Sequence, residues 1–282
     1  GSSSIVVSDP SLDNEIGLSN FNNVKDTALI IDSIGITQIT SLKFVGCSSS
    51  ENGGGLVLRG ANATYSLKSC TFSSNSALGK GGCIYSESVM EIDRSSFRRN
   101  NATLGGSIYT EGSNLIVALT SFSSCRAEVG GGAIYATNSS VLLSVSSSFS
   151  DCTAVSGGGI FVENTVSESV VTMNRTDFID NSATTGAAID CCADDSTCMV
   201  ALNFISGTLD DNISSDGGPE FACDGYSAAF TLITVDSDTS NWVEIVLIAL
   251  FSLLSGLLLI GALLVAFLLY KKRKPLSYQP IN

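Results

Sequence analysis

The chain has 282 residues, with 14 basic and 27 acidic side chains and a formal net charge of −13 at pH 7. This acidic balance argues against nucleic acid as a partner, because nucleic-acid-binding domains present basic surfaces. Histidine is absent, which excludes histidine-based catalytic triads and metal sites with histidine ligands. All 27 acidic residues lie at or before Glu244, whereas the last four basic residues follow it.

Residues 1–20 are polar, and Asp9-Pro10 indicates a turn, so we expect an irregular N-terminal segment. No secretory leader is recognisable, which leaves open whether residue 1 is a matured or a truncated end. Aliphatic runs at residues 28–31 and 34–36 then predict an opening coil that lacks the glycine pair found in later coils. We therefore expect the folded ectodomain to begin near residue 21.

From residue 44 onward, one pattern occurs six times. A phenylalanine is followed three places later by Asn or Cys, and then by a glycine-rich pair and an aliphatic residue. The phenylalanines lie 28, 25, 25, 27 and 29 residues apart, and a period in this range indicates a repeat architecture. They are Phe44, Phe72, Phe97, Phe122, Phe149 and Phe178. The Asn or Cys residues are Cys47, Asn75, Asn100, Cys125, Cys152 and Asn181.

The residues within each period predict strands rather than helices. Runs at 115–119, 141–145 and 169–173 are short, rich in β-branched residues and bounded by Gly, Ser, Asn or Asp. No segment before residue 243 keeps an apolar period of 3.6 for the length of a helix. We therefore predict an all-β fold, a parallel β-helix over residues 21–236.

In such a fold, equivalent side chains of successive coils lie about 4.8 Å apart. We expect the phenylalanines to stack inside as an aromatic ladder, and the Asn amides to satisfy one another where the chain turns. The glycine pair permits positive φ or close backbone approach at the next corner.

The recurrent Phe-x-x-Asn and Gly-Gly-Ala-Ile motifs between residues 40 and 190 resemble the repeats of the polymorphic membrane proteins of Chlamydia. They also resemble those of surface proteins in protists such as trichomonads. The resemblance implies a right-handed parallel β-helix that is displayed on a cell surface and associated with adhesion. The layout is closest to that of the single-pass protist proteins, because this chain ends in one apolar segment.

Four of the nine cysteines lie near the end of the ectodomain, in a predicted cap of about residues 190–225: Cys191, Cys192, Cys198 and Cys223. In an extracellular protein such a cluster forms disulfides more often than it binds metal, and zinc would need four suitable ligands. We predict at least one disulfide here, with its connectivity open. Cys125 and Cys152 occupy equivalent places in adjacent coils, where either a bridge or a reduced pair is possible.

The remaining candidate sites are polar. Five Asn-x-Ser/Thr sequons predict glycan acceptors at Asn62, Asn101, Asn138, Asn174 and Asn212. A second group forms either a basic patch or an ordinary solvated face: Arg94, Arg98, Arg99 and Arg126.

A polysaccharide-cleaving enzyme on this fold would need two carboxylates in a cleft. Adjacent carboxylates occur only at Asp194-Asp195 and Asp210-Asp211, in turn-like segments where solvation is the ordinary explanation. The Gly-Gly-x-Gly-x-Asp repeat of calcium-binding β-rolls is absent. We therefore predict no catalytic activity, no cofactor and no metal.

Residues 243–270 predict a transmembrane helix. The 26 residues from Ile245 to Tyr270 carry no charge, and as a helix they would extend about 39 Å, more than a hydrocarbon core of about 30 Å. Trp242 and Tyr270 would anchor the two ends, and the basic run 271–274 places the tail, residues 271–282, in the cytosol. Within the tail, Tyr278 and Ile281 resemble the sorting signal that clathrin adaptors bind, although an inert tail is the alternative.

Together these features predict a single-pass plasma-membrane protein with its N-terminus outside and its C-terminus in the cytoplasm. Its β-helix ectodomain is expected to contact host cells, matrix or glycans without catalysis. The alternatives are a passive surface-coat protein and a polysaccharide lyase or hydrolase on the same fold.

Overall fold

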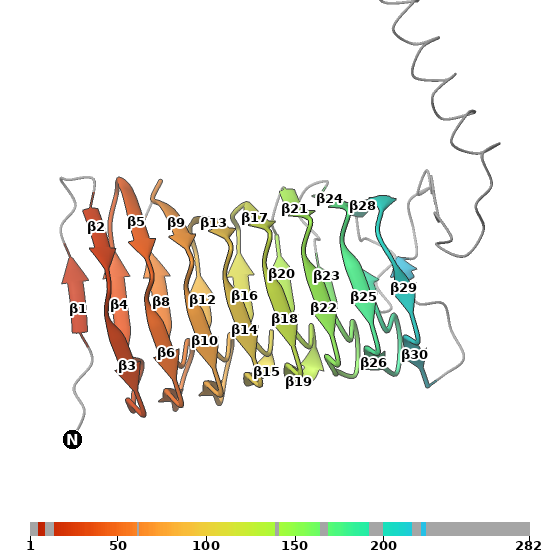
Figure 1. Cartoon of the computed structure of the whole chain (residues 1–282), viewed down its shortest axis with the longest axis horizontal. Helices are drawn as coiled ribbons and strands as arrows, with labels where there is room; N and C mark the ends of the chain where they lie inside the picture. Colours follow the sequence, from red (N-terminus) through yellow and green to blue (C-terminus); the bar gives the residue numbers. More distant parts are fainter. Residues whose placement is uncertain are drawn as a thin grey trace, which may run out of the picture. The chain divides into compact units, whose positions relative to one another are not determined.

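The computed structural model describes residues 5–8, 14–60, 62–138, 141–163, 169–191, 200–215 and 221–223. They belong to one compact unit that spans Gly1–Val235. All regular structure in these residues is β-strand, and every strand pairing is parallel. The strands of successive coils lie side by side in chain order along the long axis (Figure 1). The predicted all-β parallel β-helix is therefore confirmed.

Two long sheets, which we call sheet A and sheet B, form two sides of the coils. Sheet A has nine strands in the order β1 (Ile5–Ser8), β4 (Leu29–Asp32), β8 (Leu56–Arg59), β12 (Ile84–Ser86), β16 (Ile108–Glu111), β20 (Ile134–Thr137), β23 (Ile160–Glu163), β27 (Ile189–Cys191) and β31 (Phe221–Cys223). Sheet B has eight in the order β2 (Asn14–Gly17), β5 (Ile36–Thr40), β9 (Thr64–Lys68), β13 (Val89–Asp93), β17 (Leu115–Ala118), β21 (Val141–Val145), β24 (Ser169–Asn174) and β28 (Val200–Ser206).

Sheet C carries the phenylalanines. Its eight strands are β3 (Asn20–Asn22), β6 (Lys43–Val45), β10 (Thr71–Ser73), β14 (Ser96–Arg98), β18 (Ser121–Ser123), β22 (Ser148–Ser150), β25 (Asp177–Ile179) and β29 (Leu209–Asp210). Sheet D follows it in most coils, with β7 (Ser48–Ser49), β11 (Ser76–Ala77), β15 (Asn101–Leu104) and β19 (Arg126–Gly130). A bridge at Thr153 continues this side to the pair β26 (Ser182–Ala183) and β30 (Ile213–Ser214).

The predicted phenylalanine ladder forms the centre of the core. Each of the six predicted rings is fully buried, and Phe72 pairs in register with Phe44 on one side and Phe97 on the other. Neighbouring ring centroids lie 4.6–5.1 Å apart with nearly parallel planes. The ladder also includes Phe21, whose ring stacks 4.7 Å from that of Phe44. At the other end, Phe221 covers Phe178 edge-on at 6.4 Å.

The asparagines three places after the rings bind the preceding coil. Oδ1 of Asn75 accepts from the backbone N–H of Cys47 at 2.9 Å, and its Nδ2 donates to the carbonyl of Phe44 at 3.1 Å. Asn100 repeats both bonds one coil later and also accepts from Nδ2 of Asn75 at 3.3 Å. The predicted amide ladder is thus confirmed, and most of its bonds go to backbone groups at the corner.

The glycine pair has two functions, one for each residue. Gly131 has a φ of +65°, a conformation that side-chain-bearing residues rarely adopt. At Gly132 a Cβ would lie 2.0 Å from the carbonyl oxygen of Gly158 in the next coil. Both predicted reasons for glycine are therefore confirmed at adjacent positions.

The other corners were not predicted in detail. Between sheets B and C, hydroxyl side chains take the place of asparagine: Ser95 Oγ accepts from the backbone N–H of Cys70 at 3.1 Å. Thr120 and Ser147 continue the series at 3.2 Å each. The residue before each of these hydroxyls has positive φ without being glycine, as at Arg94. A hydrogen bond to the next coil supports this conformation, since the backbone N–H of Arg94 donates to the carbonyl of Ala118 at 3.1 Å.

The N-terminal segment differs from its prediction as an irregular stretch. Strands β1 and β2 belong to the first coil, where Ile5 pairs with Leu29 and Ile16 with Ile39. These short segments become strands because β4 and β5 offer them unpaired backbone groups, a partner that local sequence does not reveal.

No helix in the described residues is long and apolar enough to cross a membrane. The predicted transmembrane segment, residues 243–270, and the tail, residues 271–282, lie outside the described residues.

Replacing Phe122 by Ala should lower the free energy of unfolding by about 3 to 5 kcal/mol, because the substitution leaves a cavity in the ladder that the neighbouring rings cannot fill. Urea unfolding of the full-length chain measures the change. Ser123→Ala, at the outward position of the same strand, is the matched control and should stay within about 0.5 kcal/mol of the parent. A loss below about 1 kcal/mol for Phe122→Ala would contradict the ladder's importance.

Candidate functional site

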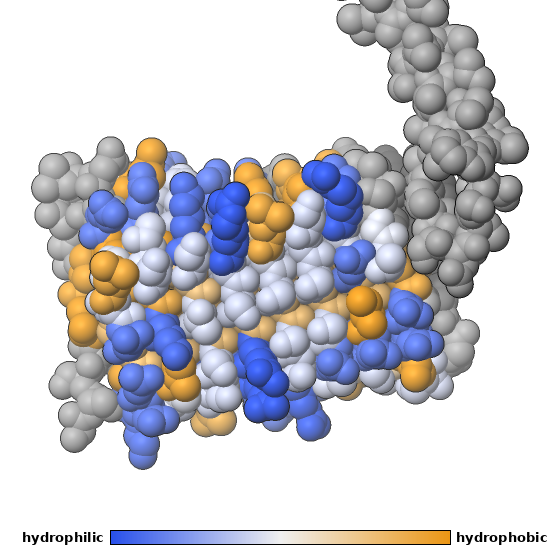
Figure 2. Space-filling view, in the orientation of Figure 1, coloured by the Kyte–Doolittle hydropathy of each residue, from blue (hydrophilic) through white to orange (hydrophobic). Residues whose placement is uncertain are grey.

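The outer face of sheet C is rich in short hydroxyl side chains. In each three-residue strand the central phenylalanine points into the core, so the residues on either side point outward. In the four central strands, β10, β14, β18 and β22, Arg98 is the one outward residue that is not a Ser or Thr. The hydroxyl residues are Thr71, Ser73, Ser96, Ser121, Ser123, Ser148 and Ser150. Figure 2 shows a pale area of intermediate hydropathy across the middle of this face.

Three of the four arginines considered as a basic patch come together at the edge of this face. Arg98 ends β14, Arg99 is the corner residue that follows, and Arg126 begins β19 in the next coil. All three are exposed, and within the described part of the chain none forms an ion pair. Arg94 lies at a different corner, where its guanidinium pairs with Asp93. Arg98, Arg99 and Arg126 are therefore neighbours on one exposed edge, as either a basic patch or a solvated face would have them, and Arg94 is not among them.

A second ladder of rings, which sequence analysis did not predict, lies on the outer face of sheet A. Tyr85, Tyr109 and Tyr135 stack with centroids 5.6 and 5.3 Å apart, and Phe161 follows at 4.8 Å. The four side chains are 3–7% exposed. Because each ring covers a face of the next, these rings are not available to stack on a sugar.

Glutamates run beside this outer ladder and accept hydrogen bonds from it. The hydroxyl of Tyr85 donates to Glu87 at 2.7 Å, and that of Tyr135 donates to Glu163 at 2.7 Å. Burial, followed by the neighbouring carboxylate, raises the pKa of both tyrosines. The phenols therefore remain protonated donors at neutral pH.

Lys80 completes the row. Its Nζ lies 3.4 Å from Oε2 of Glu111 and 4.4 Å from the ring centroid of Tyr109. The signal was present in the sequence as Ile-Tyr-x-Glu at residues 84–87 and 108–111. Adjacent carboxylates in the sequence do not reveal this row, because Glu87 and Glu111 come from successive coils and Glu163 lies two coils beyond Glu111.

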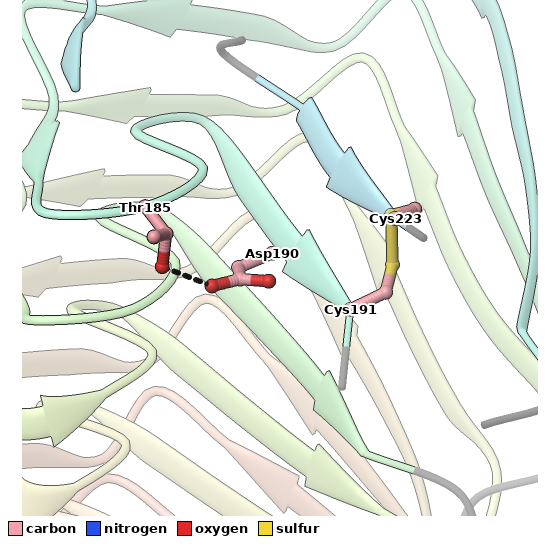
Figure 3. Close-up of a disulfide and its surroundings, with 4 residues drawn as sticks. All are labelled: Thr185, Asp190, Cys191 and Cys223. Atoms are coloured by element: carbon pink, nitrogen blue, oxygen red, sulfur yellow. Dashed lines mark hydrogen bonds between the residues drawn. A yellow bond between two sulfur atoms is a disulfide. The ribbon is translucent and has the colours of Figure 1, made fainter. Parts of the chain in front are cut away.

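The predicted cysteine cap contains a disulfide between Cys191 and Cys223 (Figure 3). It joins β27 to β31 and thereby fixes the last strand of sheet A. Beside it, the hydroxyl of Thr185 donates to Asp190 at 2.6 Å. The prediction of at least one disulfide is confirmed, while the other two cysteines of the cluster, Cys192 and Cys198, lie outside the described residues.

The cysteines of the core are reduced. Cys125 and Cys152 are free and buried, which favours the reduced pair over a bridge. Cys47, Cys70 and Cys83 are also free and buried. Burial raises the pKa of Cys83 and Cys152, so both are poor nucleophiles.

The five sequons differ in their surroundings. Asn62 and Asn101 are exposed, whereas Asn138 and Asn174 are half-buried. The amide of Asn212 belongs to the corner ladder, since its Nδ2 donates to the carbonyl of Phe178 at 2.9 Å and its Oδ1 accepts from Asn181. Glycan attachment at all five stays a prediction.

The remaining predicted positions do not form a site. Asp210 and Asp211 are exposed, at the end of β29 and at the corner after it. Asp194-Asp195 and the tail residues Tyr278 and Ile281 lie outside the described residues. Within the described ranges, no three Cys, Asp or Glu side chains are placed to hold a metal ion.

The chain belongs to the right-handed β-helix family, whose model, described as a right handed beta helix region, matches residues 20–205. The match agrees with the parallel coils and supplies their handedness. Searches of curated proteins and of solved structures found no match. Because this fold occurs in both surface adhesins and polysaccharide-degrading enzymes, family membership does not choose between them.

We expect peptide mapping without reduction to recover Cys191 linked to Cys223. The five core thiols should react with iodoacetamide only after unfolding, because their burial excludes the reagent. A peptide pair that links Cys125 to Cys152 would contradict the reduced arrangement.

The outer ladder should make stability sensitive to high pH. The folded-state pKa of Tyr85, Tyr109 and Tyr135 lies above the ordinary value near 10. The contribution of these tyrosines to the free energy of unfolding is therefore complete below about pH 10 and is lost as the pH rises through the folded-state pKa values. A variant with all three changed to Phe should lose less stability between about pH 9 and 12 in urea unfolding. Equal losses in parent and variant would show that the ladder does not titrate in this way.

Proposed function

We propose that this chain is a single-pass protein of the plasma membrane whose β-helix ectodomain binds other surfaces without catalysis. The observation that carries the proposal is the outer face of sheet C together with the exposed charged residues at its edge, among them Arg99 and Asp151. Mostly half-buried hydroxyl side chains and exposed charged side chains are held there on strands of successive coils, in a fixed register. Because these side chains are already held in place, binding a partner costs less conformational entropy, which suits a recognition surface.

The repeat motifs support the same function. Phe-x-x-Asn and Gly-Gly-Ala-Ile resemble the repeats of chlamydial polymorphic membrane proteins and of protist surface proteins, which implies adhesion. The uncharged segment 243–270, with the basic run after it, supports an anchor that leaves the N-terminus outside. Tyr278 and Ile281 would then be accessible to clathrin adaptors in the cytoplasm.

Glycans on the ectodomain are part of this proposal. Asn62 and Asn101 are the best acceptors because their side chains are exposed. Asn138 and Asn174 follow, and Asn212 should be used least because its amide is engaged in the corner ladder. The ligands that fit an array of hydroxyl and charged groups are glycans and polar protein surfaces of host cells or matrix.

A polysaccharide lyase or hydrolase is the alternative that one observation favours, the row of glutamates on sheet A. Glu87 and Glu163 already accept bonds from tyrosine hydroxyls, and a catalytic pair would have to release them. Release of reducing ends from a polysaccharide, lost in Glu111→Gln, would favour the enzyme. A passive coat protein is the second rival, and it would share the fold and the anchor.

Cells that display the full-length chain should adhere to target cells severalfold more than cells that display the segment 237–282 fused to an unrelated domain. The reason is that many weak contacts add up when both partners are held on surfaces. Adhesion is counted under flow. Protease added to intact cells should remove the ectodomain and spare an epitope after Asn282, which verifies display. Equal adhesion of the two populations would leave the passive coat as the better account.

A further inference from the structure

The corner between sheets C and D changes the sign of its charge along the coils. Four successive coils place Arg99, Ser124, Asp151 and Asp180 at the same position, with φ between 53° and 54°. Their equivalence is visible in the backbone bonds, because the N–H of each donates one coil onward, as from Arg99 to Ser123. Arg126 lies two residues after Ser124, so basic side chains occupy two coils, and acidic side chains occupy the next three, because Asp211 follows Asp180 at the same position.

The charged side chains at this corner form no ion pair with the described part of the chain. They belong to Arg99, Arg126, Asp151 and Asp180, and all four are exposed. Adjacent coils lie about 4.8 Å apart, so each charge falls at a predictable height along the axis. We call residues 99, 126, 151 and 180 the charged corner.

We propose that the charged corner is the contact between two copies of this chain that lie antiparallel to each other. A two-fold axis between the coil of Ser124 and the coil of Asp151 places Arg99 opposite Asp180 of the second copy. The same axis places Arg126 opposite Asp151 of the second copy. An interface of this kind is self-complementary, as two-fold symmetry requires. A parallel arrangement would instead place like charges together.

Uncharged side chains next to the corner fit the same axis. Val129 and Val155 are each 51% exposed and lie in the two coils that the axis relates. Exposed Leu78 and Ile213, at 75% and 64%, lie on the sheet D side further from the axis. Matched apolar groups would become buried in the dimer, whereas in a single copy they face water.

The inference rests on the proposed function and adds a partner, a second copy on another surface. β-Helices that stood upright on two opposing surfaces, each anchored at its C-terminal end, would meet antiparallel, which is the orientation that the charges select. A contact limited to one corner and its adjoining face is small, so strength would come from many copies.

Beads test the contact with the full-length chain, purified in mild detergent and attached through a tag after Asn282. Parent beads should form clumps. One variant carries Arg99→Asp with Arg126→Asp, the other Asp151→Arg with Asp180→Arg, and beads of either alone should clump at least tenfold less. The corner already accommodates both residue types, as Arg99 and Asp151 show, so the exchanges suit the backbone.

Beads of the two variants in different colours should form mixed clumps when combined. Each Asp of one variant then faces an Arg of the other at all four contacts, and this rescue also shows that both variants fold. Arg59→Asp with Lys68→Asp, exposed on sheets A and B, gives the same change of net charge as the Arg99→Asp with Arg126→Asp variant and should clump like the parent. Salt at about 1 M, where the Debye length is about 3 Å, should disperse parent clumps.

Three results would overturn the inference: parent beads that stay dispersed, single variants that clump like the parent, or mixed variants that do not clump. Parent beads that stay dispersed yet bind target cells would leave the proposed adhesive function intact. Clumping beads without adhesion to target cells would leave the self-contact and remove the broader function.

Discussion

Hydrogen bonding between successive coils is the constraint on which the rest of this structure depends. A coil alone leaves backbone N–H and C=O groups unpaired along both of its edges, and only another coil in the same register satisfies them. That register aligns Phe97 with Phe72 and Phe122, and it brings the backbone at Gly132 too close to the next coil for a side chain. The sequence repeats because every coil must meet this same requirement.

The inner parts of the coil were predictable for the same reason. The phenylalanine ladder, the asparagine corner and the glycine pair each meet one demand that recurs in every coil, so six weak signals support one another. The disulfide was predictable only as a class, since four crowded cysteines do not specify that Cys191 reaches Cys223 across 32 residues.

The outer tyrosine ladder and its glutamates were not predicted, because the partners of each residue lie in another coil. Tyr135 and Glu163 are 28 residues apart in sequence, and nothing near either of them indicates the bond. The first coil was not predicted for a related reason, since β1 and β2 are strands because they pair with the edges of β4 and β5. Arginine and aspartate at positive φ are also not predicted by local rules, because the next coil supplies the backbone hydrogen bond that supports them.

Constant register has a consequence for length. A coil duplicated between Phe97 and Phe122 would meet the same glycines, rings and amides on both sides, so the rod could grow without a new fold. The order of charges along the corner would nevertheless change, because one added coil displaces arginine from aspartate by about 4.8 Å. Two rods of unequal coil number would then match poorly at the corner. In a protein of this construction, length itself can distinguish one variant from another.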